Sequence, residues 1–184
     1  GNRVGVVDSI VGLGGRRFRF IGEQNHAGTT MMSIRKDAAT ALFALAQGIN
    51  DAFSALAGPR SVWTMGRVEV RPGAASIVPG YAELELQYRD PSMTMLDAFE
   101  AEVDRLVNEI RSRDQATVEM SPSRERIAPV MMDETLRVHL GSSAQKHAPG
   151  QWVEMPSGAY HDAGVMAALL PTAMLFIPSI GGVS

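Results

Sequence analysis

The sequence lacks cysteine, an excess of basic residues and long apolar runs. With no cysteine among 184 residues, the chain has no disulfide framework, thiolate metal ligand or cysteine nucleophile, which is typical of a reducing compartment such as the cytoplasm. A formal net charge of −3 argues against a nucleic-acid partner, because such proteins usually carry a basic stripe. No apolar run approaches the roughly 18 residues of a membrane span, so we expect a cytoplasmic protein without a membrane partner.

The composition is that of a globular protein. Hydrophobic residues make up 45% and charged residues 20% of the chain, which is an ordinary balance for a folded domain. The chain starts without methionine or a signal-peptide pattern and ends in Ile-Gly-Gly-Val-Ser without a helix or a polar tail. We therefore expect a piece of a longer protein.

Periodicity predicts an α+β fold in the first two thirds of the chain. Apolar residues alternate with polar ones in the expected strands and recur at steps of three and four in the expected helices. Thr94 and Asp97 have capping-box spacing at the start of the second helix. The predicted order is strand 16–21, helix 34–56, strands 62–70 and 81–89, helix 96–110 and strand 115–120. This βαββαβ order is that of a ferredoxin-like domain.

Strands alternate with helices in the last third of the chain. The patterns predict a helix over 133–147, a strand over 151–155, a helix over 159–169 and a buried parallel strand over 173–178. These few elements predict part of an α/β domain. The expected organisation is a segment of that domain at 1–15, a ferredoxin-like domain at 16–121, and a partial α/β segment at 122–184.

His26 is a candidate for chemistry because it lies among polar residues and glycine just before a long helix. Binding groups concentrate in loops that rigid elements position, and an imidazole there could donate a hydrogen bond to a developing oxyanion. The alternative is that Asn25 and His26 only satisfy the turn and the helix N-terminus. Spacing alone does not separate the two.

Arg89 ends the polar face of the predicted strand 81–89. A guanidinium binds a carboxylate through two parallel hydrogen bonds, so Arg89 is a candidate substrate clamp. The alternative is a solvated arginine paired with Asp90.

Two loops could offer backbone N–H groups to a ligand. Residues 72–76 form a Pro-Gly segment that ends in Ser76, and residues 157–163 form a turn of small residues that leads into a helix. His161 and Asp162 are neighbours in the second loop. Adjacent residues seldom chelate one ion, and no third ligand is near in sequence, so we expect no metal site there.

Taken together, four stretches resemble the group of N-carbamoyl-amino-acid amidohydrolases, β-ureidopropionases and allantoate amidohydrolases. This group belongs to the two-metal aminoacylase and carboxypeptidase clan. The stretches follow one another in the family's order: Gly22-Glu-Gln-Asn-His-Ala-Gly-Thr-Thr30, Pro72-Gly-Ala-Ala-Ser-Ile-Val-Pro-Gly80, Met155-Pro-Ser-Gly-Ala-Tyr-His-Asp-Ala163 and Met174-Leu-Phe-Ile-Pro-Ser-Ile-Gly-Gly-Val-Ser184.

The resemblance implies a catalytic domain with two zinc or manganese ions and an inserted ferredoxin-like lid that forms a homodimer. It implies that His26 reaches the partner subunit's active site and polarises the scissile carbonyl. It also implies that Arg89 binds the substrate carboxylate. The remaining residues implied to bind the substrate are Ser76, Gly158, Ala159 and His161.

The chain departs from the family pattern at three positions. Gly73 and Ser76 stand where the family usually has asparagine, and Met31 stands where proline is common. By the same alignment, the metal ligands and the general-base glutamate would precede Gly1 or follow Ser184. We therefore expect no metal ligand within this chain and no catalysis by the chain alone.

The function implied for the parent protein is hydrolysis of the linear C–N amide of an N-carbamoyl or ureido acid, a small molecule. Two alternatives stay open: a peptidase or aminoacylase of the same clan, and a non-catalytic dimerisation module whose sheets pair edge to edge. A third, RNA recognition by the ferredoxin-like order, is disfavoured by the acidic balance and by the absence of an aromatic-rich strand.

Overall fold

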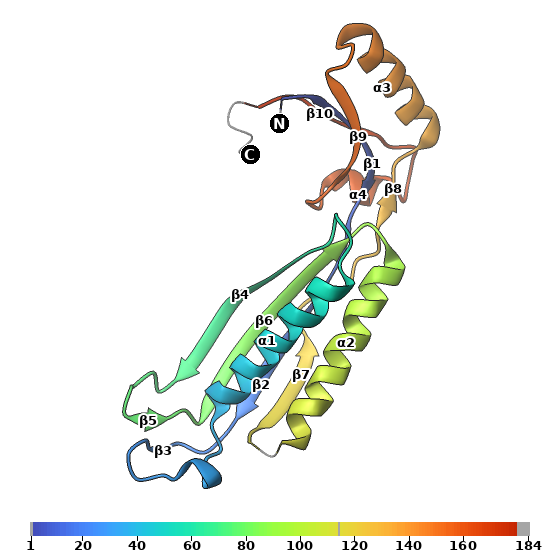
Figure 1. Ribbon diagram of the computed structural model, residues 1–184. Coiled ribbons are helices and arrows are strands. Elements are labelled where there is room, and N and C mark those ends of the chain that lie inside the picture. The colour runs from blue at the N-terminus through green and yellow to red at the C-terminus, as the bar shows by residue number, and fades with distance from the viewer. Residues whose placement is uncertain (1, 114, 180–184) are drawn as a thin grey trace. The chain divides into compact units, whose positions relative to one another are not determined.

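The computed structural model describes residues 2–113 and 115–179, and its elements fall into two units (Figure 1). The ferredoxin-like unit comprises Leu13–Tyr88 and Thr94–Arg126. The terminal unit comprises Gly1–Gly12, Arg89–Met93 and Ile127–Ser184.

The ferredoxin-like unit is a four-stranded sheet with two helices on one face (Figure 1). Its strand order is β4-β6-β2-β7, and β2 and β7 pair antiparallel, with Phe18 opposite Met120. The elements in chain order are β2 (Gly12–Ile21), α1 (Ala38–Leu56), β4 (Val62–Arg71), β6 (Tyr81–Asp90), α2 (Met93–Ser112) and β7 (Thr117–Pro122). The predicted α+β class and the βαββαβ order are confirmed.

The core of this unit lies between the sheet and the helices. The apolar face predicted for β6 is fully buried: Ala82, Leu84, Leu86 and Tyr88 are each 0% exposed. At one end of the core the ring of Phe53 stacks on Phe99 with centroids 4.1 Å apart. Strand β2 begins at Gly12, before the predicted residue 16. A Cβ added to Gly14 would lie 2.6 Å from the ring of Tyr88. The glycine there permits a close contact within a continuous strand.

The starts of both helices differ from the prediction. Helix α1 begins at Ala38 because the Asp37 carboxylate accepts hydrogen bonds from the N–H groups of Ala39 and Thr40 at 2.9 and 3.1 Å. Ile34 lies outside this helix, in the short 3₁₀ turn Met32–Ile34.

The capping box predicted for α2 is wrong. This helix begins at Met93, so Thr94 is already within its first turn and is not its N-cap. Asp97 instead forms an ion pair with Arg126 at 2.7 Å.

The terminal unit is built around β1 (Val4–Ile10). β9 (Trp152–Ser157) pairs with it in parallel, while β8 (Val130–Met131) and β10 (Met174–Phe176) pair antiparallel. α3 (Glu134–His147) confirms the helix predicted there, with the Asp133 carboxylate accepting from the N–H of Leu136 at 2.9 Å.

Two predictions for the terminal unit are wrong. The strand predicted as buried and parallel is β10, which runs antiparallel to β1 and leaves Leu175 46% exposed. The predicted helix 159–169 is only α4 (Asp162–Met166). After it, the N–H groups of Ala168 and Leu169 donate to the carbonyl oxygen three residues earlier, the latter to Met166 at 2.9 Å, so the chain continues in tighter turns. The last part of the fourth matching stretch, residues 180–184, lies outside the described residues. Among the helices described, none is both long and apolar enough to cross a membrane.

Glu83 is a buried carboxylate on the sheet face opposite the helices. It is 5% exposed and accepts hydrogen bonds from the Tyr81 hydroxyl at 2.9 Å and from Arg19 at 3.3 Å. Arg67 also lies 3.3 Å away. Burial alone would raise the pKa of Glu83, but the Tyr81 and Arg19 hydrogen bonds and the neighbouring guanidinium groups lower it below its ordinary value.

Replacing Glu83 by glutamine should destabilise the fold near neutral pH. Because the pKa of Glu83 is lower in the folded state, its charge stabilises the fold above the unfolded pKa of about 4.3 and ceases to do so as pH falls through the folded value. We expect the stability gap between wild type and Glu83→Gln, measured by urea unfolding, to close at acidic pH. Glu85→Gln is the control, because Glu85 is more exposed and has one ion pair at 3.6 Å. An equal gap at neutral and acidic pH would contradict this account.

Candidate functional site

A small two-stranded ribbon carries His26. β3 (Asn25–His26) pairs antiparallel with β5 (Ile77–Val78), with His26 opposite Ile77. The next residue, Ala27, donates its N–H to the carbonyl oxygen of Ser76 at 2.9 Å. The structure therefore brings the predicted site residues His26 and Ser76 together, although both were predicted to lie in loops.

The His26 ring is held in one tautomer. The Gly28 N–H donates a hydrogen bond to His26 Nδ1 at 3.0 Å. A neutral imidazole whose Nδ1 accepts carries its proton on Nε2. Nε2 has no hydrogen-bond partner within the described part of the chain, and the residue is exposed. His26 therefore presents a neutral N–H donor to its surroundings.

The loop after His26 is held by its own hydrogen bonds. Arg35 donates to the carbonyl oxygens of Ala27 and Thr30, the latter at 3.0 Å. The Thr30 hydroxyl donates to the His26 carbonyl at 2.7 Å. The alternative that His26 serves the helix N-terminus does not hold, because Asp37 caps α1. The imidazole is held by hydrogen bonds of its own turn and does not cap the helix.

Arg89 lies against the predicted turn 157–161 in the terminal unit. It donates a hydrogen bond to the carbonyl oxygen of Gly158 at 2.7 Å. His161 Nε2 lies 2.9 Å from the buried hydroxyl of Ser157. A cavity of about 540 Å³ is lined by this turn, including Ala159, and by apolar side chains of β10. Four predicted site residues, Arg89, Gly158, Ala159 and His161, are thus brought together.

His26 and Arg89 are separated by the length of a strand. The ribbon that holds His26 lies where β6 begins, since His26 pairs with Ile77 and β6 starts at Tyr81 (Figure 1). Arg89 is the ninth of the ten residues of β6. At a rise of about 3.3 Å per residue, the run from Tyr81 to Arg89 spans roughly 25 Å. The two residues therefore lie near opposite ends of β6.

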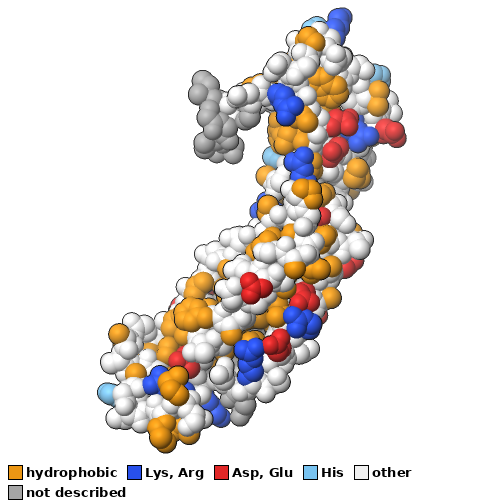
Figure 2. All heavy atoms as spheres, in the orientation of Figure 1, with side chains coloured by type: hydrophobic (Ala, Val, Ile, Leu, Met, Phe, Trp, Pro, Cys, Tyr) orange, Lys and Arg blue, Asp and Glu red, His pale blue; other side chains and the backbone are white. Residues whose placement is uncertain are grey.

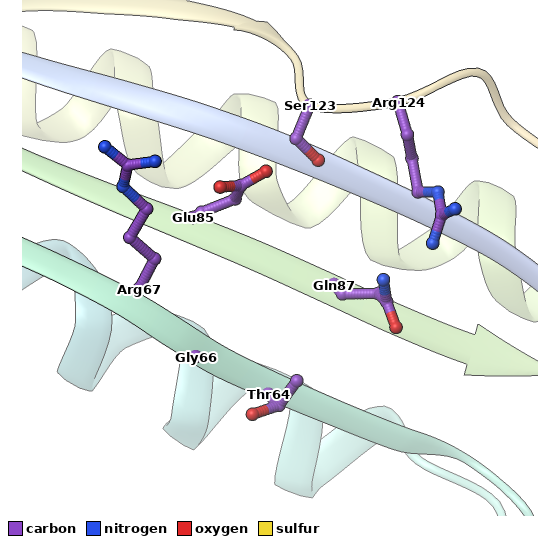
Figure 3. Close-up of a pocket in the computed structure, with 7 residues that line it drawn as sticks. All are labelled: Thr64, Gly66, Arg67, Glu85, Gln87, Ser123 and Arg124. Atoms are coloured by element: carbon purple, nitrogen blue, oxygen red, sulfur yellow. The ribbon is translucent and has the colours of Figure 1, made fainter.

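A second depression lies on the helix-free face of the ferredoxin-like sheet (Figure 3). Its volume is about 420 Å³, and it contains none of the predicted site residues. Two of its three charged side chains already have partners: Glu85 pairs with Arg17 at 3.6 Å, and Arg67 with Glu83 at 3.3 Å. We assign it no ligand.

The chain matches known proteins over nearly its whole length. It is 32% identical to allantoate amidohydrolase from Escherichia coli over all of the chain and 44% of that protein. It is 30% identical to N-carbamoyl-L-amino-acid amidohydrolase from Paenarthrobacter aurescens over 97% of the chain and 43% of that protein. A crystal structure of a hydantoinase/carbamoylase family amidase from Burkholderia phymatum superposes with a TM-score of 0.91 at 46% identity, covering 96% of the chain and 44% of that structure.

The chain is a homologue of the hydantoinase/carbamoylase amidases. The family suspected from the four matching stretches is thereby confirmed. No family model matches the chain. The chain spans less than half the length of these relatives, so the activity of the whole protein is treated below as a proposal.

The two metal ions implied by the family resemblance are not accommodated by the residues described. Within 2–113 and 115–179, no three His, Cys, Asp or Glu side chains gather closely enough to hold a metal ion. The donor set therefore does not fit a metal pair, and we derive no reaction step through one. The pair of zinc or manganese ions stays a prediction for the amidase as a whole.

Proposed function

We propose that this chain supplies the dimerising lid and the substrate-carboxylate site of an amidohydrolase acting on N-carbamoyl or ureido acids. The observation that carries the proposal is the hydrogen bond from Gly28 N–H to His26 Nδ1, in a chain homologous to hydantoinase/carbamoylase amidases. That bond leaves the outer ring nitrogen as the neutral donor that an amide carbonyl requires. The names of the relatives, allantoate amidohydrolase and N-carbamoyl-L-amino-acid amidohydrolase, support the substrate class.

The proposed chemistry assigns separate tasks to His26 and Arg89. When water adds to the amide carbonyl, negative charge develops on the oxygen, and the His26 Nε2–H stabilises that charge more strongly than it stabilises the neutral carbonyl. Arg89 binds the carboxylate of the substrate in the ground state and the transition state alike. The C–N bond then breaks as the leaving nitrogen takes up the proton lost by the attacking water, so that the amine leaves and the carbonyl carbon departs as the acid.

We infer that the two residues act together across a homodimer. They lie near opposite ends of β6, so the His26 of one subunit would serve the Arg89 site of its partner. Three exposed apolar side chains follow His26 in the same loop: Met31 is 67%, Met32 77% and Ile34 62% exposed. Figure 2 shows hydrophobic side chains at the surface of this end of the unit. Apolar groups gathered beside a site residue suit a surface that a partner covers.

Exposed apolar side chains at one edge of the sheet offer a second surface for the proposed dimer. β4 is an outermost strand, and its Val62 and Val68 are each 53% exposed. Phe43, on α1, is 61% exposed. It lies seven residues, about two helical turns, before Asn50, whose side chain accepts a hydrogen bond from Trp63 of β4. Phe43 is therefore on the side of α1 that faces this edge.

Replacing Phe43 by glutamate should weaken self-association at least about tenfold, because a carboxylate would be placed in an apolar contact. Sedimentation of the chain at tens of micromolar, roughly the range in which weak dimers show, measures this. The matched control is Val138→Glu, since Val138 is a similarly exposed apolar residue (57%) on a helix of the other unit. A wild-type chain that stays monomeric, or a Phe43 variant that dimerises as well as wild type, contradicts the proposed interface.

Replacing Arg89 by lysine in the intact protein should mainly raise KM, on the order of tenfold or more, and leave kcat within a few-fold. Lysine keeps the positive charge but loses the paired N–H groups that match a carboxylate. The same variant loses the hydrogen bond to Gly158, so the assay should include an amide substrate without the carboxylate. If kcat/KM falls as much for that substrate as for the substrate with the carboxylate, Arg89 supports the turn and does not bind the substrate.

The substrate class is tested by assaying the intact protein with an N-carbamoyl amino acid, allantoate, an N-acetyl amino acid and a dipeptide. We expect hydrolysis of the first two. Hydrolysis of only the acetyl compound or the dipeptide would instead establish an aminoacylase or a peptidase.

A further inference from the structure

Ser157 is a buried serine whose hydroxyl contacts His161. It is the last residue of β9 and is 1% exposed. Its backbone pairs with Ile10 of β1, and the N–H of Val11, the residue after β1, donates to the Ser157 carbonyl oxygen at 3.0 Å. Its Oγ lies 2.9 Å from His161 Nε2, 2.9 Å from the carbonyl oxygen of Ala159 and 3.3 Å from the N–H of Ala159.

The position of each proton follows from these partners. A serine hydroxyl has one hydrogen, and a carbonyl oxygen can only accept, so that hydrogen lies between Ser157 Oγ and the Ala159 oxygen. The lone pairs of Oγ then accept from the Ala159 N–H and from His161 Nε2. His161 Nε2 must therefore carry a proton, and in the neutral ring Nδ1 is an acceptor. Nδ1 has no hydrogen-bond partner among the residues described.

We propose that Ser157 is a positioning residue that holds His161 in the Nε2–H tautomer, so that Nδ1 accepts an N–H of the ligand. The ligand assignment rests on the proposed function. His26 presents an N–H and His161 a lone pair, because the local bonds fix opposite nitrogens of the two rings. A carbamoyl group has the complementary pattern, a carbonyl oxygen and a terminal NH₂. His161 therefore selects a carbamoyl group over an acyl group that lacks the terminal nitrogen.

Nothing about Ser157 points to a nucleophile. Its hydroxyl proton is committed to the Ala159 carbonyl, while the adjacent imidazole donates to the oxygen. A general base would have to accept that proton.

The tautomer is tested by ¹⁵N NMR on the 184-residue chain without metal or substrate, at a pH of about 8.5, where an ordinary imidazole is neutral. We expect the His161 Nε2 proton to be present and protected from exchange with water. In Ser157→Ala its exchange should accelerate at least about tenfold as the bond is lost. Ser9→Ala is the control, because Ser9 is a buried serine (4% exposed) of the same unit whose hydroxyl bonds to Asp8.

A His161 protonated on Nδ1 in the wild-type chain overturns the proposal, and so does an unchanged Nε2–H exchange rate in a folded Ser157→Ala. If Ser157→Ala does not fold, the wild-type spectrum decides. None of these results depends on amidase activity, so they are separable from a failure of the proposed function.

The ligand assignment has its own measurement. In the intact protein, the ratio of kcat/KM for an N-carbamoyl amino acid to that for the N-formyl derivative of the same amino acid should fall about tenfold in Ser157→Ala, which is the effect of one misdirected hydrogen bond. An unchanged ratio overturns the recognition of the terminal nitrogen by His161.

Discussion

Replacing His26 by alanine in the intact protein is expected to lower kcat by on the order of a hundredfold or more, with little change in KM. The exposed Nε2–H fixed by Gly28 donates to an oxygen whose charge develops only as the tetrahedral intermediate forms. Its loss therefore affects the transition state far more than substrate binding. Steady-state kinetics on an N-carbamoyl amino acid measures the two constants separately.

Two variants control this experiment. His139→Ala removes an exposed histidine from α3 and should leave the kinetics unchanged. His26→Asn keeps a neutral N–H donor and should retain more kcat than alanine does. If His26→Ala raises KM and leaves kcat unchanged, His26 binds substrate and does not stabilise the oxyanion.

Replacing Phe53 by alanine should lower the free energy of unfolding by about 3–5 kcal/mol. The Phe53 ring is 0% exposed, stacks on Phe99 at 4.1 Å and meets Trp63 and Tyr88 edge-on at 5.6 and 5.9 Å. Truncation removes the favourable free energy of burying the ring. It also opens a cavity among three aromatic neighbours, and because these belong to different elements they cannot all move in to fill it. Urea unfolding followed by tryptophan fluorescence reports on this region, because Trp63 contacts the ring directly.

The matched control is Phe43→Ala, which removes the same ring from the surface of the same helix, where it is 61% exposed. We expect a change within about 0.5 kcal/mol, measured below the concentration at which the chain dimerises. Equal losses at the two positions would mean that the aromatic cluster does not form the core of this unit.

The sequence predicted the elements that have a long, clean period. β6 alternates over ten residues, and its apolar positions are the buried ones. Short elements have no period to detect, so the two-residue strands β3, β5 and β8 were missed. The start of α1 was misplaced because Ile34 fits the helical spacing, whereas the competing signal, the Asp37 cap, decides where the helix begins. The direction of β10 depends on its partner, which apolar composition does not specify.

The candidate site residues could be proposed from the sequence, but the contacts between them could not. His26 and Ser76 meet through a ribbon between segments 50 residues apart, and Arg89 meets Gly158 across 69 residues. Such pairings depend on the tertiary fold, which periodicity does not encode. The turn that begins at Ser157 was predicted to contact a ligand, but the Ser157 hydroxyl was given no role, although a serine four residues before a histidine in a glycine-containing turn was a usable signal.

The most direct test of the central claim, that His26 of one subunit serves the Arg89 site of its partner, is to mix two variants of the intact protein and assay them far below the wild-type KM. At that substrate concentration the lowered kcat of one variant and the raised KM of the other leave each with little activity when assayed alone. His26→Ala and Arg89→Ala subunits are combined in equal amounts and allowed to exchange. In each hybrid dimer, one site then has an intact Arg89 and an intact partner His26, while the other site has neither. With half of the dimers hybrid and one active site in each, activity should return to about a quarter of the wild-type value. If mixing restores no activity although subunit exchange is demonstrated, His26 does not act across the dimer and the account is contradicted.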